Sequence, residues 1–395
     1  MGQPAYLNAL GIVSALGVGK VETTRRLMAG DTLGMGKDEN LLIGGTVLVG
    51  CVTAKTAIVP QEYPYHNSRN NELLLTAIDE IRDDIDNIIS KYGAQRVGVV
   101  LGTSTSGIRE GEKAIATYDR NGKLPDSFDY RMWEIGSPAL FLSKYLDISG
   151  PSYVVSTACS SSAKALIAAR NMLLAGLCDA VITGGVDSLC QLTVNGFNAL
   201  ESISSELMNP MSINRKGLNI GEGAAVFIMS REPAPIALLG AGEASDAYHF
   251  TAPDPKGVGA TMAINDALTD SGIAKDDLCY LNLHGTATKK NDEMESNVIF
   301  RVLSPHIPSS STKPLTGHTL GAAGAIEAAF CWLTISDYNT EGVLPPHIWD
   351  GKIDINLPTI TLVEHGRKLQ GPKYTMSNSF AFGGSNASLV VGEAR

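Results

Sequence analysis

The chain has 395 residues, of which 44% are hydrophobic, and a formal net charge of −10 from 31 Lys and Arg against 41 Asp and Glu. This length predicts two or three domain-sized units of roughly 100–200 residues and leaves ample material for a large core. The acidic balance, without a basic stripe, argues against a nucleic-acid-binding protein.

The N-terminus and the cysteines indicate the compartment. Residues 1–17 lack a charged segment followed by an apolar block and a cleavage site, so no signal peptide is expected. No run of about 18 apolar residues predicts a membrane span. The cysteines form no CxxC pair and no Cys/His spacing suited to zinc: Cys51, Cys159, Cys178, Cys190, Cys279 and Cys331. We therefore expect a cytoplasmic protein with reduced thiols and no metal site.

Short apolar stretches alternate with helices rich in small residues, which predicts an α/β protein. In the first part of the chain, the expected strands are residues 96–101, 153–157, 180–183 and 224–229. A helix is expected over residues 160–175, with one apolar face made by Ala163, Leu166, Ile167, Leu173 and Leu174.

The pattern restarts after a proline-containing break at residues 231–235. The strands expected beyond it are residues 236–242, 278–283, 375–380 and 387–391. Helices are expected over 258–271 and 321–335, the second with Ile326, Phe330 and Leu333 on one side. The repetition predicts two similar halves, residues 1–235 and 236–395.

Residues 156–162 (STACSSS) carry Cys159 from the end of a predicted strand to the first turn of a predicted helix. The free N–H groups and the dipole of a helix N-terminus favour negative charge, so the pKa of the Cys159 thiol is expected to be lowered. A thiolate is the nucleophilic form of cysteine, and one formed in this way needs no obligatory base. This motif alone leaves a buried structural cysteine open as the alternative.

Three further motifs place polar residues beside glycines. Residues 282–288 (NLHGTAT) put His284 at the end of a predicted strand, and residues 311–324 (STKPLTGHTLGAAG) put His318 in a glycine-rich turn. Residues 378–386 (NSFAFGGSN) contain a glycine pair that lets backbone amides approach a ligand. Most histidines are structural, but these contexts single out two of them.

Glu327 lies inside an otherwise apolar predicted helix. A buried carboxylate needs a partner. Lys313, in the motif before that helix, is the candidate, which predicts a buried ion pair close to His318.

With these motifs in order, the chain resembles the elongating β-ketoacyl-[acyl-carrier-protein] synthases of the thiolase-like superfamily. The resemblance runs nearly from end to end, with further matches at residues 209–224 and 246–253. It implies a thiolase-like α/β fold, in which two similar βαβ-type halves form a five-layered α-β-α-β-α arrangement.

The resemblance also implies a Cys-His-His site. Cys159 corresponds to the nucleophile that accepts the acyl group, and His284 and His318 correspond to the histidines that act on the malonyl thioester. Lys313 and Glu327 correspond to the ion pair that orders the site. The other implied site residues are the oxyanion-hole and gate residue Phe382, the structural acid Glu295, and the substrate-binding Thr286, Thr288, Thr105 and Phe380.

The reaction implied is a decarboxylative Claisen condensation of malonyl-[acyl-carrier protein] with the acyl group on Cys159, which lengthens the chain by two carbons. No metal or redox cofactor is expected, and the 4′-phosphopantetheine arm arrives on the carrier protein. The expected partners are the acyl carrier protein and either a second copy of the chain or a chain-length-factor-like subunit that lacks the nucleophile.

Several residues depart from the fatty-acid members of this family. Ala381 and Ser385 stand where housekeeping members usually have Gly and Thr, and Thr105 stands where a Gly or an Ile forms the pocket floor. The carrier-docking region near residues 60–70 keeps only Arg69 as a positive charge. These departures favour similarity to the synthases of type II polyketide clusters, particularly those that make aryl polyenes.

Two other functions could be inferred from the same motifs. A degradative thiolase would need a second cysteine near the C-terminus as its base, and the late candidate, Cys331, falls in the middle of a predicted helix. A non-catalytic chain-length subunit would have lost the nucleophile, whereas Cys159 is present together with both histidines. A chain-initiating Cys-His-Asn synthase is excluded by His318.

Overall fold

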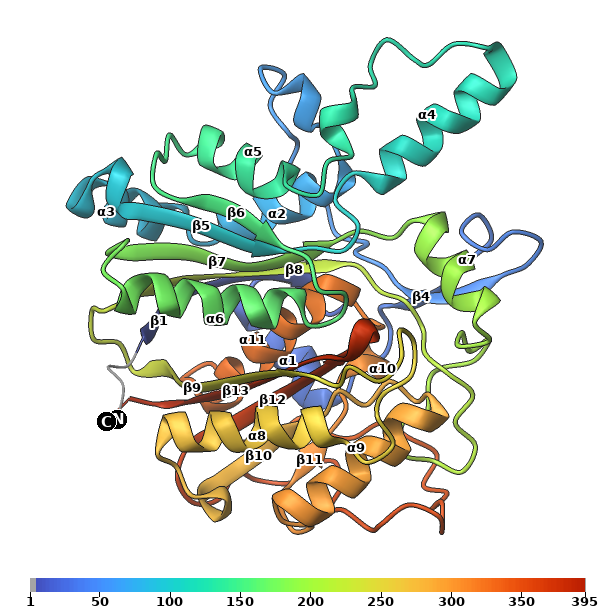
Figure 1. The fold of residues 1–395 in the computed structure, drawn as a ribbon, viewed down its shortest axis with the longest axis vertical. Helices are drawn as coiled ribbons and strands as arrows, with labels where there is room; N and C mark the ends of the chain where they lie inside the picture. Colours follow the sequence, from blue (N-terminus) through green and yellow to red (C-terminus); the bar gives the residue numbers. More distant parts are fainter. Residues whose placement is uncertain (1–4, 395) are drawn as a thin grey trace.

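A computed structural model of the chain describes residues 5–394; the outer ends of the two predicted halves, residues 1–4 and 395, lie outside the described residues. Two layers of strands are separated by helices and covered by helices on their outer faces (Figure 1). The five-layered α-β-α-β-α arrangement expected from the sequence is therefore confirmed.

The first strand layer runs in the order β6 (Ser152–Val155), β5 (Val97–Gly102), β7 (Ala180–Asp187), β8 (Gly223–Ser230) and β1 (Ala5–Ser14). β5 lies parallel to β6 and β7, whereas β8 is antiparallel to β7 and β1. β5, β7 and β8 are buried along their whole length. Their continuous apolar runs suit strands that are covered on both faces.

The second strand layer runs in the order β9 (Ile236–Ser245), β13 (Ser385–Glu393), β12 (Tyr374–Ala381), β10 (Leu278–Asn282) and β11 (Ser309–Ser310). β10 is parallel to β11 and β12, and β13 is antiparallel to β12 and β9. The first layer shows the same succession of parallel and antiparallel pairs. β1 also pairs with β9 through Ala5 and Tyr6, which joins the two layers at one end.

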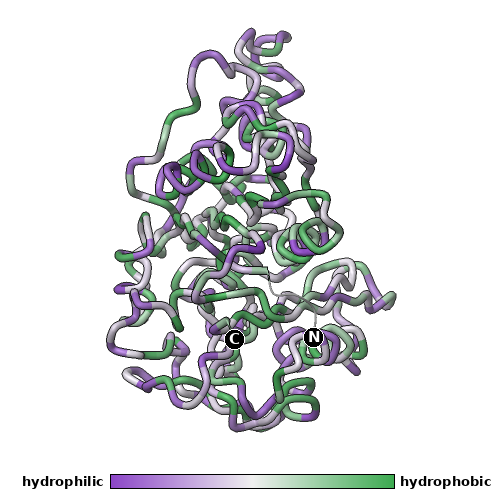
Figure 2. Tube along the Cα trace, turned by 90° about the vertical axis from the view of Figure 1, so that its left-hand side faces the viewer, coloured by the Kyte–Doolittle hydropathy of each residue, from purple (hydrophilic) through white to green (hydrophobic). Residues whose placement is uncertain are grey.

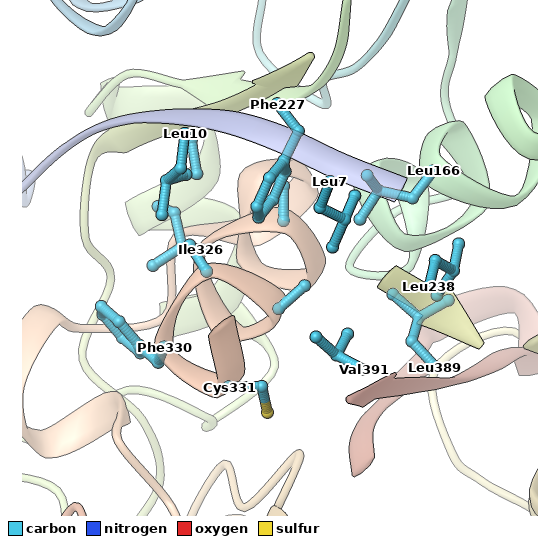
Figure 3. Close-up of a cluster of buried hydrophobic side chains, with 14 of the residues drawn as sticks. Leu7, Leu10, Leu166, Phe227, Leu238, Ile326, Phe330, Cys331, Leu389 and Val391 are labelled. Carbon is cyan, nitrogen blue, oxygen red and sulfur yellow. The ribbon is translucent and has the colours of Figure 1, made fainter. Parts of the chain in front are cut away.

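The helices between the strand layers are α6 (Ser161–Leu174) and α11 (Ala323–Ile335), with α1 (Lys20–Ala29) packed against α11. α6 and α11 approach closely at Gly324, where a Cβ would lie 2.6 Å from the backbone nitrogen of Ala163. Figure 3 shows Ile326, Phe330 and Cys331 of α11 among side chains from both strand layers. This central cluster packs the two strand layers against the helices between them.

Helices α2 (Arg69–Asp79), α3 (Arg82–Tyr92) and α5 (Ser137–Tyr145) cover the outer face of the first strand layer, and α8 (Val258–Ser271) and α9 (Lys289–Val302) cover that of the second. The elements at the margin are α4 (Ile108–Asn121), α7 (Gln191–Ala199), β2 (Gly17–Val18) and the hairpin of β3 (Met35–Asp38) and β4 (Val47–Gly50). The short helix α10 (Lys313–Thr316) is buried along its whole length. In Figure 2 the hydrophilic stretches lie mainly along the outer helices and loops.

The elements predicted from periodicity are present, with corrections at particular residues. Leu174 is 44% exposed, so it does not belong to the buried face of α6. The helix predicted from residue 321 begins with a 3₁₀ turn at Leu320–Ala322, and α11 starts at Ala323. The strand expected over residues 153–157 ends at Val155, because the chain turns sharply before Cys159.

Within residues 5–394, no helix is both long enough and apolar enough to cross a membrane.

Candidate active site

Cys159 sits in a tight turn between β6 and α6. Ala158 adopts a φ of +52°, a conformation that is unfavourable for a residue with a Cβ and that directs the next residue out of the strand line. α6 begins at Ser161 with Ser160 as its N-cap. Cys159 therefore precedes the helix instead of lying in its first turn as expected, and it is only 5% exposed.

Burial raises the pKa of the Cys159 thiol to about 12, while the charge of Lys313 and the backbone N–H of Phe382 oppose the rise. The lowered thiol pKa predicted from the helix N-terminus is therefore wrong, because removing the sulfur from water outweighs the favourable charges around it. At neutral pH the thiol keeps its proton, and its reactivity depends on a nearby proton acceptor.

His318 Nε2 lies 3.0 Å from Cys159 Sγ and can accept this proton in the tautomer that carries its own proton on Nδ1. Backbone hydrogen bonds fix its loop on both sides, since His318 N donates to Asn219 O at 2.7 Å and Gly221 N donates to His318 O at 2.9 Å. His284 follows β10, and its ring centre is 5.4 Å from that of His318 with the rings nearly perpendicular. The structure thus brings the three residues of the predicted Cys-His-His site together.

Both imidazoles are buried, and burial lowers the pKa of each well below its usual value. The positive charge of Lys313 lowers both pKa values further, and His318 adds to the effect on His284. A neutral imidazole has one N–H donor and one acceptor nitrogen. Each ring can therefore accept a proton or donate a hydrogen bond at the cavity.

Lys313 and Glu327 form the predicted ion pair, and both side chains are almost fully buried. Lys313 Nζ also donates to the backbone oxygen of His284 at 2.5 Å. Burial raises the pKa of Glu327 to about 7, and the charge of Lys313 opposes that rise. The lysine thus connects α11, which carries Glu327, to the backbone of one site histidine.

Glu295 on α9 also binds the backbone at His284. It accepts hydrogen bonds from the backbone nitrogens of His284 and Gly285, both at 2.7 Å. Burial raises its pKa to about 7. The predicted structural acid therefore orients the turn that follows β10.

Cys159 and the two histidines face a cavity of about 630 Å³. Of the predicted residues, it is lined by Cys159, His284, His318, Thr286, Thr288, Phe380 and Phe382. Thr286 and Thr288 share a hydrogen bond between their hydroxyls at 3.0 Å. The Phe382 ring packs against Phe197 of α7, with ring centres 5.2 Å apart. Phe197 was not predicted, since an aromatic residue in a short helix gives no sequence signal for a site.

Residues 68–234 match the family described as "Beta-ketoacyl synthase, N-terminal domain", and residues 236–348 match "Beta-ketoacyl synthase, C-terminal domain". The chain is 32% identical over 346 residues to 3-oxoacyl-[acyl-carrier-protein] synthase 2 of Staphylococcus aureus (strain COL), which covers 82% of this chain and 81% of that protein. The chain belongs to the β-ketoacyl synthase family. It is an acyltransferase that extends acyl chains by Claisen condensation.

This β-ketoacyl synthase is also 30% identical over 322 residues to the chloroplastic 3-oxoacyl-[acyl-carrier-protein] synthase II of Arabidopsis thaliana; the match covers 77% of this chain but 59% of that protein. Among solved structures, it is similar to the ketosynthase ApeO of Xenorhabdus doucetiae, solved in complex with its chain length factor ApeC. The two are 44% identical with a TM-score of 0.95, over 99% of this chain and 98% of that one.

Thr105, predicted at the floor of the acyl pocket of this β-ketoacyl synthase, hydrogen-bonds a buried carboxylate. Its hydroxyl donates to Asp187 Oδ1 at 2.8 Å and accepts from Ser188 N at 3.1 Å, and its side chain is fully buried. Among the described residues that line the 630 Å³ cavity, Thr105 is absent. Its hydroxyl thus binds a buried carboxylate, and its place at the floor of the acyl pocket stays a prediction.

Asp187, the last residue of β7, is the buried group that the sequence did not reveal. Besides Thr105, its carboxylate accepts hydrogen bonds from Thr103 Oγ1 at 2.5 Å, Ser104 N at 2.8 Å and Gly321 N at 2.6 Å. It thereby fixes the loop after β5 against the turn that follows His318. A strand-ending acid gives no local signal of partners so far away in the chain.

Cys331 lies within α11, fully buried, with its sulfur 3.7 Å from the backbone oxygen of Met376. It is not among the described residues that line the cavity, so the geometry offers no second cysteine as the base of a degradative thiolase. Within residues 5–394 no group of three or more His, Cys, Asp or Glu side chains is placed to hold a metal ion. That the reaction needs no metal stays a prediction.

Proposed function

We propose that Cys159 carries the acyl chain and that His284 and His318 drive its condensation with malonyl-[acyl-carrier protein]. The observation that supports this most directly is the 3.0 Å contact between His318 Nε2 and Cys159 Sγ, in the wall of a cavity that His284 also faces. We further propose that the enzyme acts in the cytoplasm, on polyketide chains such as aryl polyenes, without a metal or redox cofactor.

In the loading step, Cys159 Sγ attacks the thioester carbonyl of the acyl-carrier protein while His318 Nε2 takes the thiol proton. The N–H groups of Phe382 and Cys159 are proposed to stabilise the tetrahedral oxyanion, each worth roughly 3–4 kcal/mol in comparable sites. The carbon–sulfur bond to the carrier then breaks, and His318 returns the proton to the departing thiolate. Its lowered pKa makes this return favourable.

In the condensation step, His284 and His318, the latter now in the tautomer that carries its proton on Nε2, donate hydrogen bonds to the thioester oxygen of malonyl-carrier protein. The bond to the malonyl carboxylate breaks, CO2 leaves, and the electron pair forms an enolate that these donors stabilise. The enolate carbon attacks the acyl carbonyl on Cys159, whose sulfur departs as a thiolate and takes up a proton that comes from solvent. The carrier keeps a β-ketoacyl chain two carbons longer, so the covalent intermediate divides one hard reaction into two steps.

The charge around the cavity supports an acidic carrier protein as substrate. Lys216, Lys289 and Lys290 are exposed residues that line the cavity. Lys216 pairs with Glu206, whereas Lys289 and Lys290 form no ion pair with any residue in the described part of the chain. In a chain of net charge −10, this local positive charge favours an anionic partner.

A second subunit is proposed to pair along β6. This strand ends its layer, so within residues 5–394 its outer edge has no neighbour, and Tyr153 on it is 41% exposed. Such an edge accepts another strand readily. The proposed partner is a second copy or a subunit like a chain length factor that lacks the nucleophile; the similar ApeO was solved with its chain length factor.

The proposed aryl-polyene substrate rests on the family resemblance and on the departures at Ala381, Ser385 and Thr105. Ser385 Oγ accepts a hydrogen bond from Ser160 Oγ at 3.0 Å, next to the nucleophile. Acyl chains of several lengths, saturated and polyenic, should be offered on carrier proteins. Preferential loading of polyenic chains on Cys159 would support the narrower proposal, and exclusive loading of short saturated chains would contradict it.

The residue roles are tested by the variant His284→Ala. It should still load an acyl group on Cys159, since His318 remains, but should release no CO2 from malonyl-carrier protein. Loading is read as the mass gain of the intact protein, and decarboxylation as labelled CO2. Decarboxylation at the wild-type rate would contradict the role proposed for His284.

A further inference from the structure

Two neighbouring stretches of chain line the catalytic cavity: Phe197 of α7 with the turn at residues 200–202, and residues 215–218. A hydrogen bond from Leu218 N to Ser202 O, 2.8 Å long, joins the two stretches. They differ in how the rest of the protein holds them.

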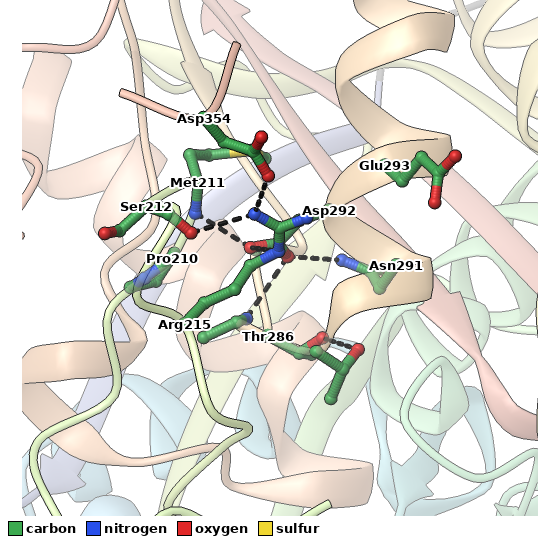
Figure 4. Close-up of polar contacts among 12 residues, drawn as sticks. Pro210, Met211, Ser212, Arg215, Thr286, Asn291, Asp292, Glu293 and Asp354 are labelled. Carbon is green, nitrogen blue, oxygen red and sulfur yellow. Dashed lines mark hydrogen bonds and ion pairs between the residues drawn. The ribbon is translucent and has the colours of Figure 1, made fainter. Parts of the chain in front are cut away.

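Buried charges hold the second stretch and the loop before it (Figure 4). Arg215 is only 7% exposed, and its Nη1 donates to Asp354 Oδ2 at 2.6 Å. Earlier in the loop, Met211 N donates to Oδ2 of the fully buried Asp292 at 2.8 Å. This part of the cavity lining is therefore fixed by contacts that exclude water.

α7 has little burial to hold it. Within this helix, which the structure describes in full, Val194 is the only buried residue. Leu192 is 58% exposed and Leu200, at its C-terminal end, is 46% exposed. A helix with so small a buried face depends on polar contacts for its position.

One of these polar contacts comes from a carboxylate on α4. Glu112 Oε2 accepts the backbone N–H of Gln191 at 2.9 Å, and its Oε1 accepts that of Leu192 at 2.6 Å. Both N–H groups lie in the first turn of α7, where a helix offers them no partner. The N-cap residue Cys190 forms no capping hydrogen bond with its side chain. Glu112 thus caps α7 from another helix, with a charge that suits a helix N-terminus.

The loop between β3 and β4 also binds the start of α7. Gln191 Nε2 donates to Asn40 O at 2.7 Å, and Asn195 Nδ2 donates to Leu41 O at 2.8 Å. These groups are neutral, and hydrogen bonds to an ionised group are the stronger kind. Among the described contacts at this end of α7, the one with Glu112 should therefore matter most for the position of the helix.

The position of α7 decides where Phe197 lies. The ring of Phe197 is centred 5.2 Å from that of Phe382, with the two planes tilted by 30°. The backbone N–H of Phe382 approaches the sulfur of Cys159, which is 5% exposed. α7 therefore supports the aromatic residue that lies next to the nucleophile.

We infer that Glu112 is a positioning residue: by holding the start of α7 it keeps Phe197 against Phe382, and this aromatic pair shields the acyl group on Cys159 from water. The inference rests on the proposed function, in which Cys159 carries the acyl group until malonyl-carrier protein arrives. Water that reached the thioester would attack its carbonyl carbon and break the carbon–sulfur bond, which leaves a free carboxylic acid and the thiol. Glu112 is not among the described residues that line the catalytic cavity, so it acts through α7.

The variant Glu112→Ala removes both acceptor oxygens. Wild type and variant are acylated with octanoyl-carrier protein, separated from it, and followed by intact-protein mass without malonyl-carrier protein. We expect the octanoyl group to leave Cys159 of the variant about fivefold faster, as for the loss of a helix cap. Loading of Cys159 should be no slower than in the wild type, which separates this effect from general damage to the site.

A double-mutant cycle tests whether Glu112 acts through Phe197. Phe197→Ala should itself shorten the life of the acyl-enzyme, and Glu112→Ala should add nothing to it, because both changes break the same chain of contacts. The control is Asp119→Ala, which removes an exposed carboxylate of α4 that has no hydrogen bond or ion pair within residues 5–394. It should keep the wild-type half-life.

An unchanged acyl-enzyme half-life in Glu112→Ala would overturn the inference, and so would a further loss in the Phe197→Ala background. A wild-type protein that forms no acyl group on Cys159 would instead contradict the proposed function.

A second pair of variants leaves Glu112 in place. Gln191→Pro removes one N–H that Glu112 accepts, and proline is tolerated at the first position of a helix. The extended backbone of Cys190, with φ −147° and ψ 158°, suits a residue that precedes proline. Gln191→Ala keeps the N–H and loses the side-chain contact with Asn40. The acyl group should leave Gln191→Pro faster than Gln191→Ala, and equal half-lives would overturn the inference even if Glu112→Ala does not fold.

Discussion

Replacing His318 with alanine tests how the nucleophile loses its proton. Burial raises the pKa of the Cys159 thiol to about 12, and His318 Nε2 at 3.0 Å is the proton acceptor in contact with it. Without the imidazole, attack depends on the small fraction of thiolate present. In the proposed mechanism, proton transfer to His318 accompanies attack, so the wild-type reaction does not need a preformed thiolate.

The size of the effect follows from that pKa. Because burial raises the pKa of the Cys159 thiol to about 12, only a very small fraction of it is ionised at pH 7. A positioned general base typically contributes about 10²–10⁴-fold, and we expect His318→Ala to slow alkylation of Cys159 by that factor at pH 7. Since the thiolate is the reactive form, the variant should gain about tenfold per pH unit until the pKa is approached.

The assay is alkylation by iodoacetamide between pH 6 and pH 10, with Cys159 modification read by peptide mass. His284→Ala is the matched control, because it removes the other cavity imidazole, which forms no hydrogen bond with the sulfur. Its Cys159 should keep the wild-type pH profile. Wild-type alkylation of His318→Ala at pH 7 would show that the thiol ionises unaided, and would refute the reasoning from burial.

Three further outcomes are expected. Lys313→Ala and Glu327→Ala should each lower the free energy of unfolding by ~3–5 kcal/mol, because each leaves a buried charge unpaired; wild-type denaturant curves for both would contradict a stabilising pair. The double variant Lys289→Glu, Lys290→Glu should raise the KM for acyl-carrier protein but not for acyl-pantetheine. An unchanged KM for acyl-carrier protein would show that the carrier protein does not dock at these lysines. Thr105→Val should cost ~1–3 kcal/mol of stability by removing a hydroxyl from a buried carboxylate, measured by urea unfolding, and should leave the length of accepted acyl chains unchanged. If folded Thr105→Val accepts acyl chains of a different maximum length from the wild type, Thr105 lines the acyl pocket.

The fold could be predicted where periodicity and burial coincide. The strands around residues 96–101 and 224–229 were recognised because a strand covered on both faces must be continuously apolar. α4 and α7 were not predicted, because neither has a wide buried apolar face: only Gly111 and Ala114 of α4 and Val194 of α7 are buried. The error at Leu174 arose because a helix period places it on the inner face, while α6 ends there and turns outward.

The site was predictable where residue chemistry and sequence context agree, as at Cys159 and the two motif histidines. The ionisation of the thiol was not, because it depends on how completely the folded chain excludes water from the sulfur. Asp187 and Asp292 were missed for a related reason. Each gathers backbone amides from segments far apart in the chain, and such partners become visible only once the fold brings them together.

The central claim is that Cys159 alone carries the acyl chain during condensation. The most direct measurement is intact-protein mass after incubation with an acyl-carrier protein, for the wild type and for Cys159→Ala, followed by addition of malonyl-carrier protein and analysis of the product. The account predicts one acyl group per wild-type chain, located on Cys159, and neither acyl-enzyme nor β-ketoacyl product from the variant. Normal β-ketoacyl product from Cys159→Ala, or acylation at another cysteine, would contradict it.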